Sequence, residues 1–168
     1  RVLFRSAVET LKNNTAIRWI ILGHGRKSDW LQEEVARRGL HSNVLLLGRF
    51  PVERMPSFYV HADALLVSLK QDPVFGLTIP GKVQSYLMAG VPILGMLDGE
   101  GAKVIADSNA GLVCAAGNSG GLALAVLEMV AMSVDQRKQL GVNGRDFAQK
   151  EFGRGLLMKQ LEALLNEA

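Results

Sequence analysis

Short apolar runs alternate with amphipathic segments along the whole chain, and this alternation constrains the fold more than any other feature. The run IRWIILG at 17–23 is nearly continuous and ends at a glycine, which is typical of a buried parallel strand. Further strands are predicted at 43–48, 63–69, 91–96 and 110–115. Helices are predicted at 1–14, 28–39, 53–62, 81–90, 100–109, 119–132, 134–151 and 153–167. This order predicts an α/β fold, in which a parallel sheet carries helices on both faces.

The size of the chain predicts one domain, because 168 residues with 48% hydrophobic content can build a single sizeable core. The first predicted element is a helix, whereas an α/β domain usually begins with a strand. We therefore expect residues 1–168 to be a single domain that lacks its first strand.

Several classes of partner are disfavoured by composition. No apolar run approaches the roughly 20 residues that cross a bilayer, so a cytoplasmic location is expected. One cysteine, Cys114, cannot form an internal disulfide, and no Cys/His spacing typical of a zinc site is found, so no metal is expected. A net charge of +3 without a dense Lys/Arg run argues against a nucleic-acid partner.

The segment GLTIPGKV at 76–83 nearly matches the phosphate-binding loop of nucleotide hydrolases. Val83 cannot supply the hydroxyl that would hold Mg²⁺, and Pro80 removes one backbone N–H. Pro80 nevertheless favours a helix start, which predicts a metal-free anion site. The free N–H groups of Gly81, Lys82 and Val83 would face the anion at a positive helix end, beside the Lys82 ammonium. The alternative is an ordinary loop before a core helix.

A second candidate is GHGRKS at 23–28, which resembles the opening of a dinucleotide-binding fingerprint. Ser28 replaces the third glycine, and no carboxylate lies about 20 residues further on to hold a ribose, so NAD-linked oxidoreduction loses most of its support. Gly23, His24 and Gly25 either line a pocket or form a tight strand–helix turn. Ser28 is expected to cap the following helix, and Gly39 to end it.

Two further positions have open interpretations. Phe50 could hold a flat base while Arg49 pairs with phosphate, or the two could be a hydrophobic plug and a solvated arginine. Asp72 could have a functional role, although an Asp before a proline is usually turn chemistry.

Three segments carry a resemblance to a known family: IRWIILGHG, NVLLLGRFPVERMPSFYVHADALLVSL and DPVFGLTIPGKVQSYLMAGVPIL. They resemble the C-terminal, Rossmann-like, nucleotide-sugar-binding half of a GT-B glycosyltransferase. Within these, the chain is similar to retaining group 1 (family 4) enzymes and to their branch that builds O-antigen, capsule and exopolysaccharide. The pattern T-[IV]-P-x-K-x-x-x-Y-L-x-A-G-x-P-I of that branch is matched by Thr78, Pro80, Lys82, Tyr86, Leu87, Ala89, Gly90, Pro92 and Ile93.

The resemblance implies roles for the candidate residues. The base would bind at Arg49 and Phe50, and the diphosphate at Gly81, Lys82 and Val83, with Lys82 stabilising the leaving group. Thr78, Ile79 and Pro80 would close around the sugar. Many family members carry two glutamates eight positions apart, and these positions fall on Leu77 and Ser85. Ser85 could make only a weaker contact to the ribose, and Leu77 cannot replace the carboxylate that faces the donor sugar.

The resemblance also implies what the complete enzyme would do. It would transfer a sugar from a nucleoside diphosphate sugar, with UDP expected first and GDP next, to a lipid-linked acceptor at the inner face of the membrane. An N-terminal domain absent from this chain would hold the acceptor, so this chain alone is expected to be inactive. The final helix, with Leu157, Leu161, Leu164 and Leu165 on one face, could mediate self-association.

Two other functions stay open at this point. The same half-fold occurs in sugar-nucleotide 2-epimerases, which usually have a carboxylate-rich cleft that Leu77 and Ser85 do not support. A non-catalytic nucleotide-binding module of the receiver or Rossmann type is the other alternative. A receiver needs acidic residues at its strand ends, where this chain has Gly23, Gly48 and Ser68.

Overall fold

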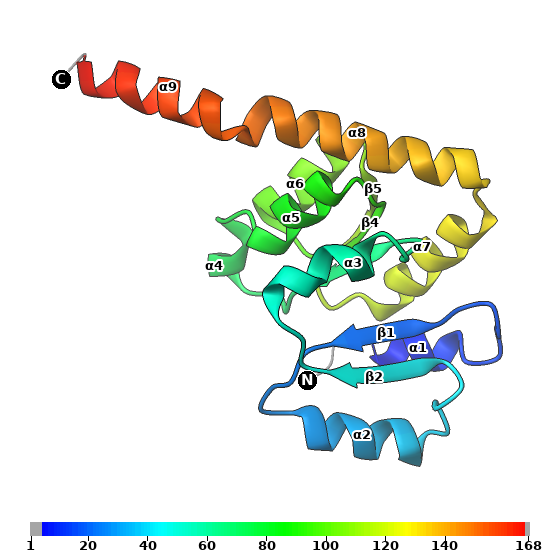
Figure 1. Ribbon diagram of the computed structural model, residues 1–168. Helices are drawn as coiled ribbons and strands as arrows, with labels where there is room; N and C mark the ends of the chain where they lie inside the picture. Colours follow the sequence, from blue (N-terminus) through cyan, green and yellow to red (C-terminus); the bar gives the residue numbers. More distant parts are fainter. Residues whose placement is uncertain (1–4, 167–168) are drawn as a thin grey trace.

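Two parallel sheets form the centre of the computed structural model, which describes residues 5–166 (Figure 1). Strand β1 (Trp19–Leu22) pairs with β2 (Val44–Gly48). In the second sheet, β4 (Ile93–Met96) lies between β3 (Leu65–Ser68) and β5 (Gly111–Cys114). The predicted α/β class with parallel strands is confirmed. The structure differs from the expected single sheet because β1 and β3 are not hydrogen-bonded to each other.

Most helices flank the sheets near the places that the sequence predicts, with bounds that differ at their ends. They are α1 (Arg5–Thr10), α2 (Ser28–Arg37), the 3₁₀ turn η1 (Val52–Arg54), α3 (Met55–Tyr59), α4 (Pro73–Gly76), α5 (Gly81–Ala89), α6 (Gly99–Asp107), α7 (Ser119–Ala131), α8 (Val134–Phe152) and α9 (Arg154–Asn166). Helix α4 is absent from the prediction. It forms because the Asp72 carboxylate accepts a hydrogen bond from the Val74 N–H and Pro73 takes the first helical position.

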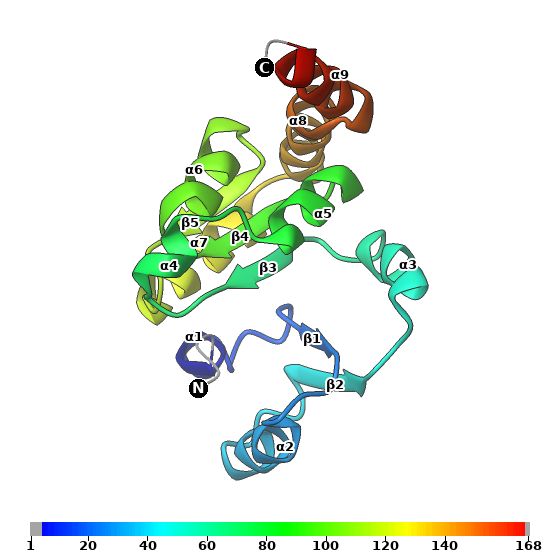
Figure 2. The ribbon, with the colours of Figure 1, turned by 90° about the vertical axis from the view of Figure 1, so that its left-hand side faces the viewer.

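The three-stranded sheet is covered on both faces. All four residues of β4 are buried, as expected for a central parallel strand. Leu94 and Met96 pack in a cluster with α1 and α7, whereas Ile93 packs in a second cluster with α5, α6 and α8. Figure 2 shows β1, β2 and α2 as a layer beside this body. A third cluster joins that layer to Val8 of α1.

Helix α8 crosses closely over the end of α5. A Cβ at Gly141 would lie 2.1 Å from the Gly90 carbonyl oxygen, so only glycine fits there. Gly90 itself has a φ of 68° and ends α5 in the left-handed conformation. The guanidinium of Arg145 donates to the Ala89 carbonyl at 2.7 Å, which satisfies one of the last carbonyls of α5.

Helix α9 continues from α8 away from the sheets (Figure 1). Its residues Leu164 and Leu165 are 65% and 68% exposed. The side chains of Leu157 and Leu161 lie outside the described part of the structure, so self-association through this helix stays a prediction. No helix among the described residues is both long enough and apolar enough to span a lipid bilayer.

Candidate functional site

The predicted ligand-binding residues lie in the loops that follow the strands. The strands of each sheet are parallel, so the loops after β1 and β2 share one edge, as do those after β3 and β4. In Figure 1, β1 and β2 point toward the side on which α4 lies. The candidate site therefore has two parts. The first part comprises residues 23–28 and 49–50, and the second comprises residues 77–85.

The start of α5 is the centre of the second part. Helix α5 begins at Gly81, as predicted, and no side chain caps it. Within the described residues, the N–H groups of Gly81 and Lys82 have no hydrogen-bond acceptor. A Cβ at Gly81 would meet nothing within 4 Å, so the backbone there is open to an approaching ligand. Lys82 is exposed, and it forms no ion pair with any residue that the structure describes.

The third predicted donor does not contribute a free amide. The Val83 N–H donates to the Pro80 carbonyl at 2.8 Å, and the Val83 side chain is fully buried. The expectation that Val83 offers an unpaired N–H to an anion is therefore wrong. The physical reason is that the first turn of α5 closes with a tight bond to the residue three positions earlier, which leaves two orphan donors at the helix start.

Two glycines of α6 hold the second part in place. A Cβ at Gly101 would lie 2.8 Å from Cδ of Pro80, so the Pro80 ring rests on the α6 backbone. Gly99 has a φ of 71°, and its Cβ would lie 2.1 Å from the Gly76 carbonyl oxygen. Sequence analysis missed both positions, although the GEG run at 99–101, shortly after a buried strand, was the available signal. These contacts fix the segment that leads into α5.

The other residues of the second part vary in exposure. Thr78 is exposed, and Ile79 is half-buried against the core cluster of α5, α6 and α8. Leu77 is 79% exposed and brings no charge. The Ser85 hydroxyl donates a hydrogen bond to the Gly81 carbonyl at 2.9 Å. Its proton is therefore already used, and its oxygen can only accept a hydrogen bond from a ligand.

The first part contains a tight turn. Gly23 has a φ of 123°, and its N–H donates to the Gly48 carbonyl at 2.6 Å, which ties the ends of β1 and β2 together. His24 and Gly25 are exposed. The Ser28 hydroxyl accepts from the Gly25 N–H at 2.8 Å, and no side chain caps α2. The predicted helix cap at Ser28 is therefore wrong, because its oxygen closes the turn instead.

The predicted end of this helix is confirmed at Gly39, which has a φ of 64°. Its N–H donates to Ala36, and the Leu40 N–H donates to Val35, which is the Schellman pattern of a glycine-terminated helix.

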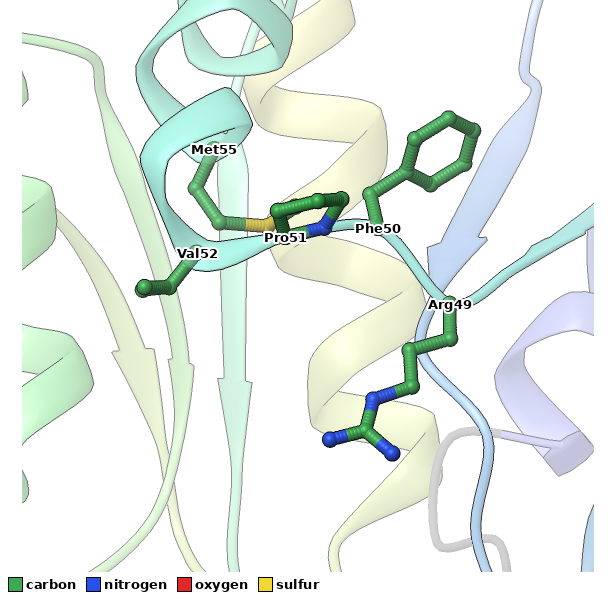
Figure 3. A pocket seen from close by; sticks show the side chains of 5 residues that line it. All are labelled: Arg49, Phe50, Pro51, Val52 and Met55. Atoms are coloured by element: carbon green, nitrogen blue, oxygen red, sulfur yellow. The ribbon is translucent and has the colours of Figure 1, made fainter.

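An open hollow of about 710 Å³ adjoins the end of β2 and is lined by Arg49, Phe50, Pro51, Val52 and Met55 (Figure 3). Figure 3 shows Arg49 and Phe50 extending to opposite sides of the backbone. The Phe50 ring packs edge-to-face on Phe58 with centroids 4.8 Å apart. Arg49 is exposed and forms no ion pair with the described residues. Phe50 is thus partly packed against Phe58 as a hydrophobic plug, while the exposed guanidinium of Arg49 is available to bind an anion.

An aromatic contact joins α3 to α5, and so connects the segment after β2 with the second part of the site. The rings of Tyr59 and Tyr86 lie edge-to-face with centroids 5.3 Å apart. Burial raises the pKa of Tyr86 to about 12, and the neighbouring Tyr59 adds to this rise. The Tyr86 hydroxyl therefore stays neutral at physiological pH.

Asp72, which could also have a functional role, has a structural role at the start of α4. It caps α4 and forms an ion pair with Lys70 at 2.8 Å. Its hydrogen bond from the Lys70 ammonium, followed by that from the Val74 N–H, lowers the pKa of the Asp72 carboxyl. In the described part of the chain, no group of three or more His, Cys, Asp and Glu side chains could hold a metal ion.

Comparison with known proteins identifies the family. Residues 1–132 match the model of the family described as glycosyl transferases group 1. The chain belongs to this family. No curated protein matched its sequence.

Solved structures similar to the chain include other glycosyltransferases of low sequence identity. A glycosyltransferase from Rickettsia africae is 15% identical with a TM-score of 0.81, and the match covers 99% of this chain and 43% of that one. Anabaena HepE in complex with UDP-glucose is 16% identical with a TM-score of 0.78, covering 99% and 44%. WaaG, involved in lipopolysaccharide biosynthesis, is 20% identical with a TM-score of 0.70, covering 94% and 40%. The chain thus spans less than half the length of these proteins.

Proposed function

We propose that the chain is the C-terminal, donor-binding domain of a retaining group 1 glycosyltransferase that uses a UDP-sugar. The observation that carries this proposal is the start of α5, where the Gly81 and Lys82 amides are unpaired beside the free Lys82 ammonium. A nucleotide-sugar partner is supported by Anabaena HepE, which was solved with UDP and with UDP-glucose.

The α5 start would stabilise the diphosphate leaving group electrostatically. The N-terminal end of a helix carries about half a positive charge, and its unpaired N–H groups can donate hydrogen bonds to phosphate oxygens. These donors and Lys82 would stabilise the negative charge that develops on the diphosphate as its bond to the sugar breaks, with no metal ion needed. Thr78, Ile79 and Pro80 would lie beside the sugar, since they lead directly into this helix.

The segment after β2 would hold the base and the ribose. Arg49 and the exposed part of Phe50 line the hollow there, so a flat ring could lie against Phe50 while Arg49 approaches a phosphate. Gly23, His24 and Gly25 would form a further wall, and Ser85 would accept a hydrogen bond from the ribose.

The complete enzyme would work between two domains. An N-terminal domain would bind a lipid-linked glycan acceptor at the inner membrane surface, for the synthesis of a surface polysaccharide such as lipopolysaccharide, O-antigen or exopolysaccharide. The protein would be cytoplasmic and peripheral to the membrane. The present chain alone would bind nucleotide and transfer no sugar.

The test is binding of UDP, GDP, ADP and NAD, measured by calorimetry, with uridine as the comparison that lacks phosphate. We expect UDP to bind more tightly than uridine. Lys82→Ala should weaken UDP binding about 10- to 100-fold, as expected for a lost charge-assisted hydrogen bond, and should leave uridine binding unchanged. Lys138→Ala, at an exposed position of α8, is the matched control. If the folded chain binds none of the nucleoside diphosphates, or if both variants weaken UDP equally, the proposal fails.

A further inference from the structure

Glu100 is an exposed carboxylate beside the second part of the candidate site. It lies in the first turn of α6. Within residues 5–166, its side chain forms no hydrogen bond and no ion pair. An acidic side chain in the first turn of a helix interacts favourably with the positive end of that helix. This effect alone could account for Glu100 on a surface far from the site, so its position is decisive.

The two glycines that flank Glu100 both touch the segment that leads into α5. A Cβ at Gly99 would collide with the Gly76 carbonyl, and a Cβ at Gly101 would lie 2.8 Å from Cδ of Pro80. The α6 backbone is thus in contact with both ends of this segment, and Glu100 is attached between the two contacts. Helix α4 also contacts α6. Glu100 therefore lies beside the residues proposed to surround the sugar.

This segment offers a sugar few hydrogen-bonding groups of its own. Residues 73–81 contain no charged side chain, and their single polar side chain is the exposed hydroxyl of Thr78. Leu77 is 79% exposed and apolar. The hydroxyl groups of a sugar need hydrogen-bond partners when they leave water. A sugar bound here therefore needs acceptors from a neighbouring element.

Three carboxylates lie in the loops after β3 and β4 and at the start of α6, and two of them already have partners. Asp72 caps α4 and pairs with Lys70 at 2.8 Å. Asp98 accepts a hydrogen bond from the Ala116 N–H at 3.0 Å, which ties the segment after β5 to the start of α6. Among the described residues, Glu100 is the member of this set whose oxygens are still available to a ligand.

We propose that Glu100 binds the donor sugar and that its carboxylate accepts hydrogen bonds from the sugar hydroxyl groups. The inference rests on the proposed function, because it requires a nucleoside diphosphate sugar with its diphosphate at the start of α5. A carboxylate offers two acceptor oxygens, and hydrogen bonds to a charged acceptor are stronger than those to a neutral one. The same charge repels a sugar that carries a carboxylate. Glu100 therefore selects a neutral sugar over a uronic acid.

Calorimetry on this chain with a set of nucleotides tests the role of Glu100. The ligands are UDP, UDP-glucose, UDP-galactose, UDP-N-acetylglucosamine and UDP-glucuronic acid. We expect at least one neutral UDP-sugar to bind about tenfold more tightly than UDP, and UDP-glucuronic acid to bind more weakly than that sugar. Glu100→Gln should remove most of this tenfold gain and reduce the discrimination against UDP-glucuronic acid. The affinity for UDP itself should stay within about threefold, because UDP carries no sugar at this position.

Asp135→Asn is the matched control, because Asp135 is also an exposed carboxylate in the first turn of a helix, α8. Both substitutions remove a charge that favours a helix start, so the two variants should change alike in Tm. Only Glu100→Gln should alter the binding of the UDP-sugars. This difference separates contact with the sugar from stabilisation of the helix.

Three results would overturn the inference. The first is a Glu100→Gln variant that keeps the full preference for a UDP-sugar over UDP. The second is UDP binding that becomes more than about threefold tighter in this variant, which would place the carboxylate beside the phosphates. The third is an unsubstituted chain that binds all the UDP-sugars no more tightly than UDP. In each case UDP still binds, so the proposed function stands, whereas a chain that binds neither UDP nor a UDP-sugar would refute both proposals.

Discussion

The substitution Gly141→Ala gives the sharpest test of how α8 packs on α5. Helix propensity alone predicts that alanine at this interior helical position stabilises the protein by about 1 kcal/mol. The structure predicts the opposite sign. The new Cβ would lie 2.1 Å from the Gly90 carbonyl oxygen, whereas ordinary contact begins near 3.4 Å, so α8 would have to move by 1.3 Å (3.4 minus 2.1).

This movement cannot be avoided by a side-chain rotation, because the atoms met are backbone. It would also stretch the hydrogen bond from Arg145 to Ala89, which is 2.7 Å long. Overpacking costs about 1–3 kcal/mol, and a strained hydrogen bond adds about 1 kcal/mol, which together exceed the propensity gain. We expect a net loss of about 2 kcal/mol, or a fall in Tm of about 4–8 °C.

Urea denaturation followed by circular dichroism measures this loss. The matched control is Gly120→Ala on α7, where the new Cβ would meet only the Asn118 side chain at 3.7 Å. The control should be neutral or stabilised by up to about 1 kcal/mol. If Gly141→Ala is as stable as the unsubstituted protein, the close approach of α8 to α5 described above is incorrect.

Three further predictions concern Arg145, Tyr86 and Gly99. Arg145→Met should lower the free energy of unfolding by about 1 kcal/mol in urea titrations, because the Ala89 carbonyl loses its donor; an unchanged midpoint would show that water replaces the donor at no cost. Since the pKa of Tyr86 is raised from 10.0 to about 12, the unfolded chain releases this proton first, and stability should fall as pH rises from 10 to 12. Tyr86→Phe should flatten that fall in denaturation curves at fixed pH, and an identical slope in the variant would contradict the assignment. Gly99→Ala should weaken UDP binding in calorimetry, because strain and the Gly76 carbonyl displace the segment before α5; unaltered affinity would mean that this segment does not position the diphosphate.

Much of the fold could be predicted because its signals are local. The five strands are short apolar runs bounded by glycine, proline or polar residues, and the pattern is visible in the sequence without tertiary information. The ends of helices were predictable where one residue decides them, as at Gly39 and at the Pro80–Gly81 start of α5. The same locality explains why α4 was missed, since four residues after Asp72 are too few to show a helical period.

The parts that could not be predicted depend on contacts between distant residues. Nothing near Gly99 or Gly101 in the sequence indicates that Gly76 and Pro80 press against them, because these pairs meet only in the fold. The division of the sheet between β1 and β3 is likewise a property of pairing, which the apolar runs do not encode individually. The number of unpaired N–H donors at the start of α5 depends on whether its first turn is tight. The hydrogen bond from the Val83 N–H to the Pro80 carbonyl makes it tight and leaves two such donors.

The two parts of the candidate site are positioned by different contacts, and these contacts bear on how a nucleotide would bind. The α5 start is fixed through Pro80 by the backbone of α6, and the end of α5 by α8. Arg49 lies in the segment between β2 and α3, and the contact of Tyr59 with Tyr86 ties α3 to α5. A diphosphate on α5 with its base at Phe50 would therefore depend on a spacing that this aromatic pair helps to set. Removing the ring at Tyr59 should therefore weaken the binding of UDP more than the binding of inorganic pyrophosphate, because pyrophosphate would contact only the start of α5. Equal weakening of both would show that the two parts do not bind one ligand.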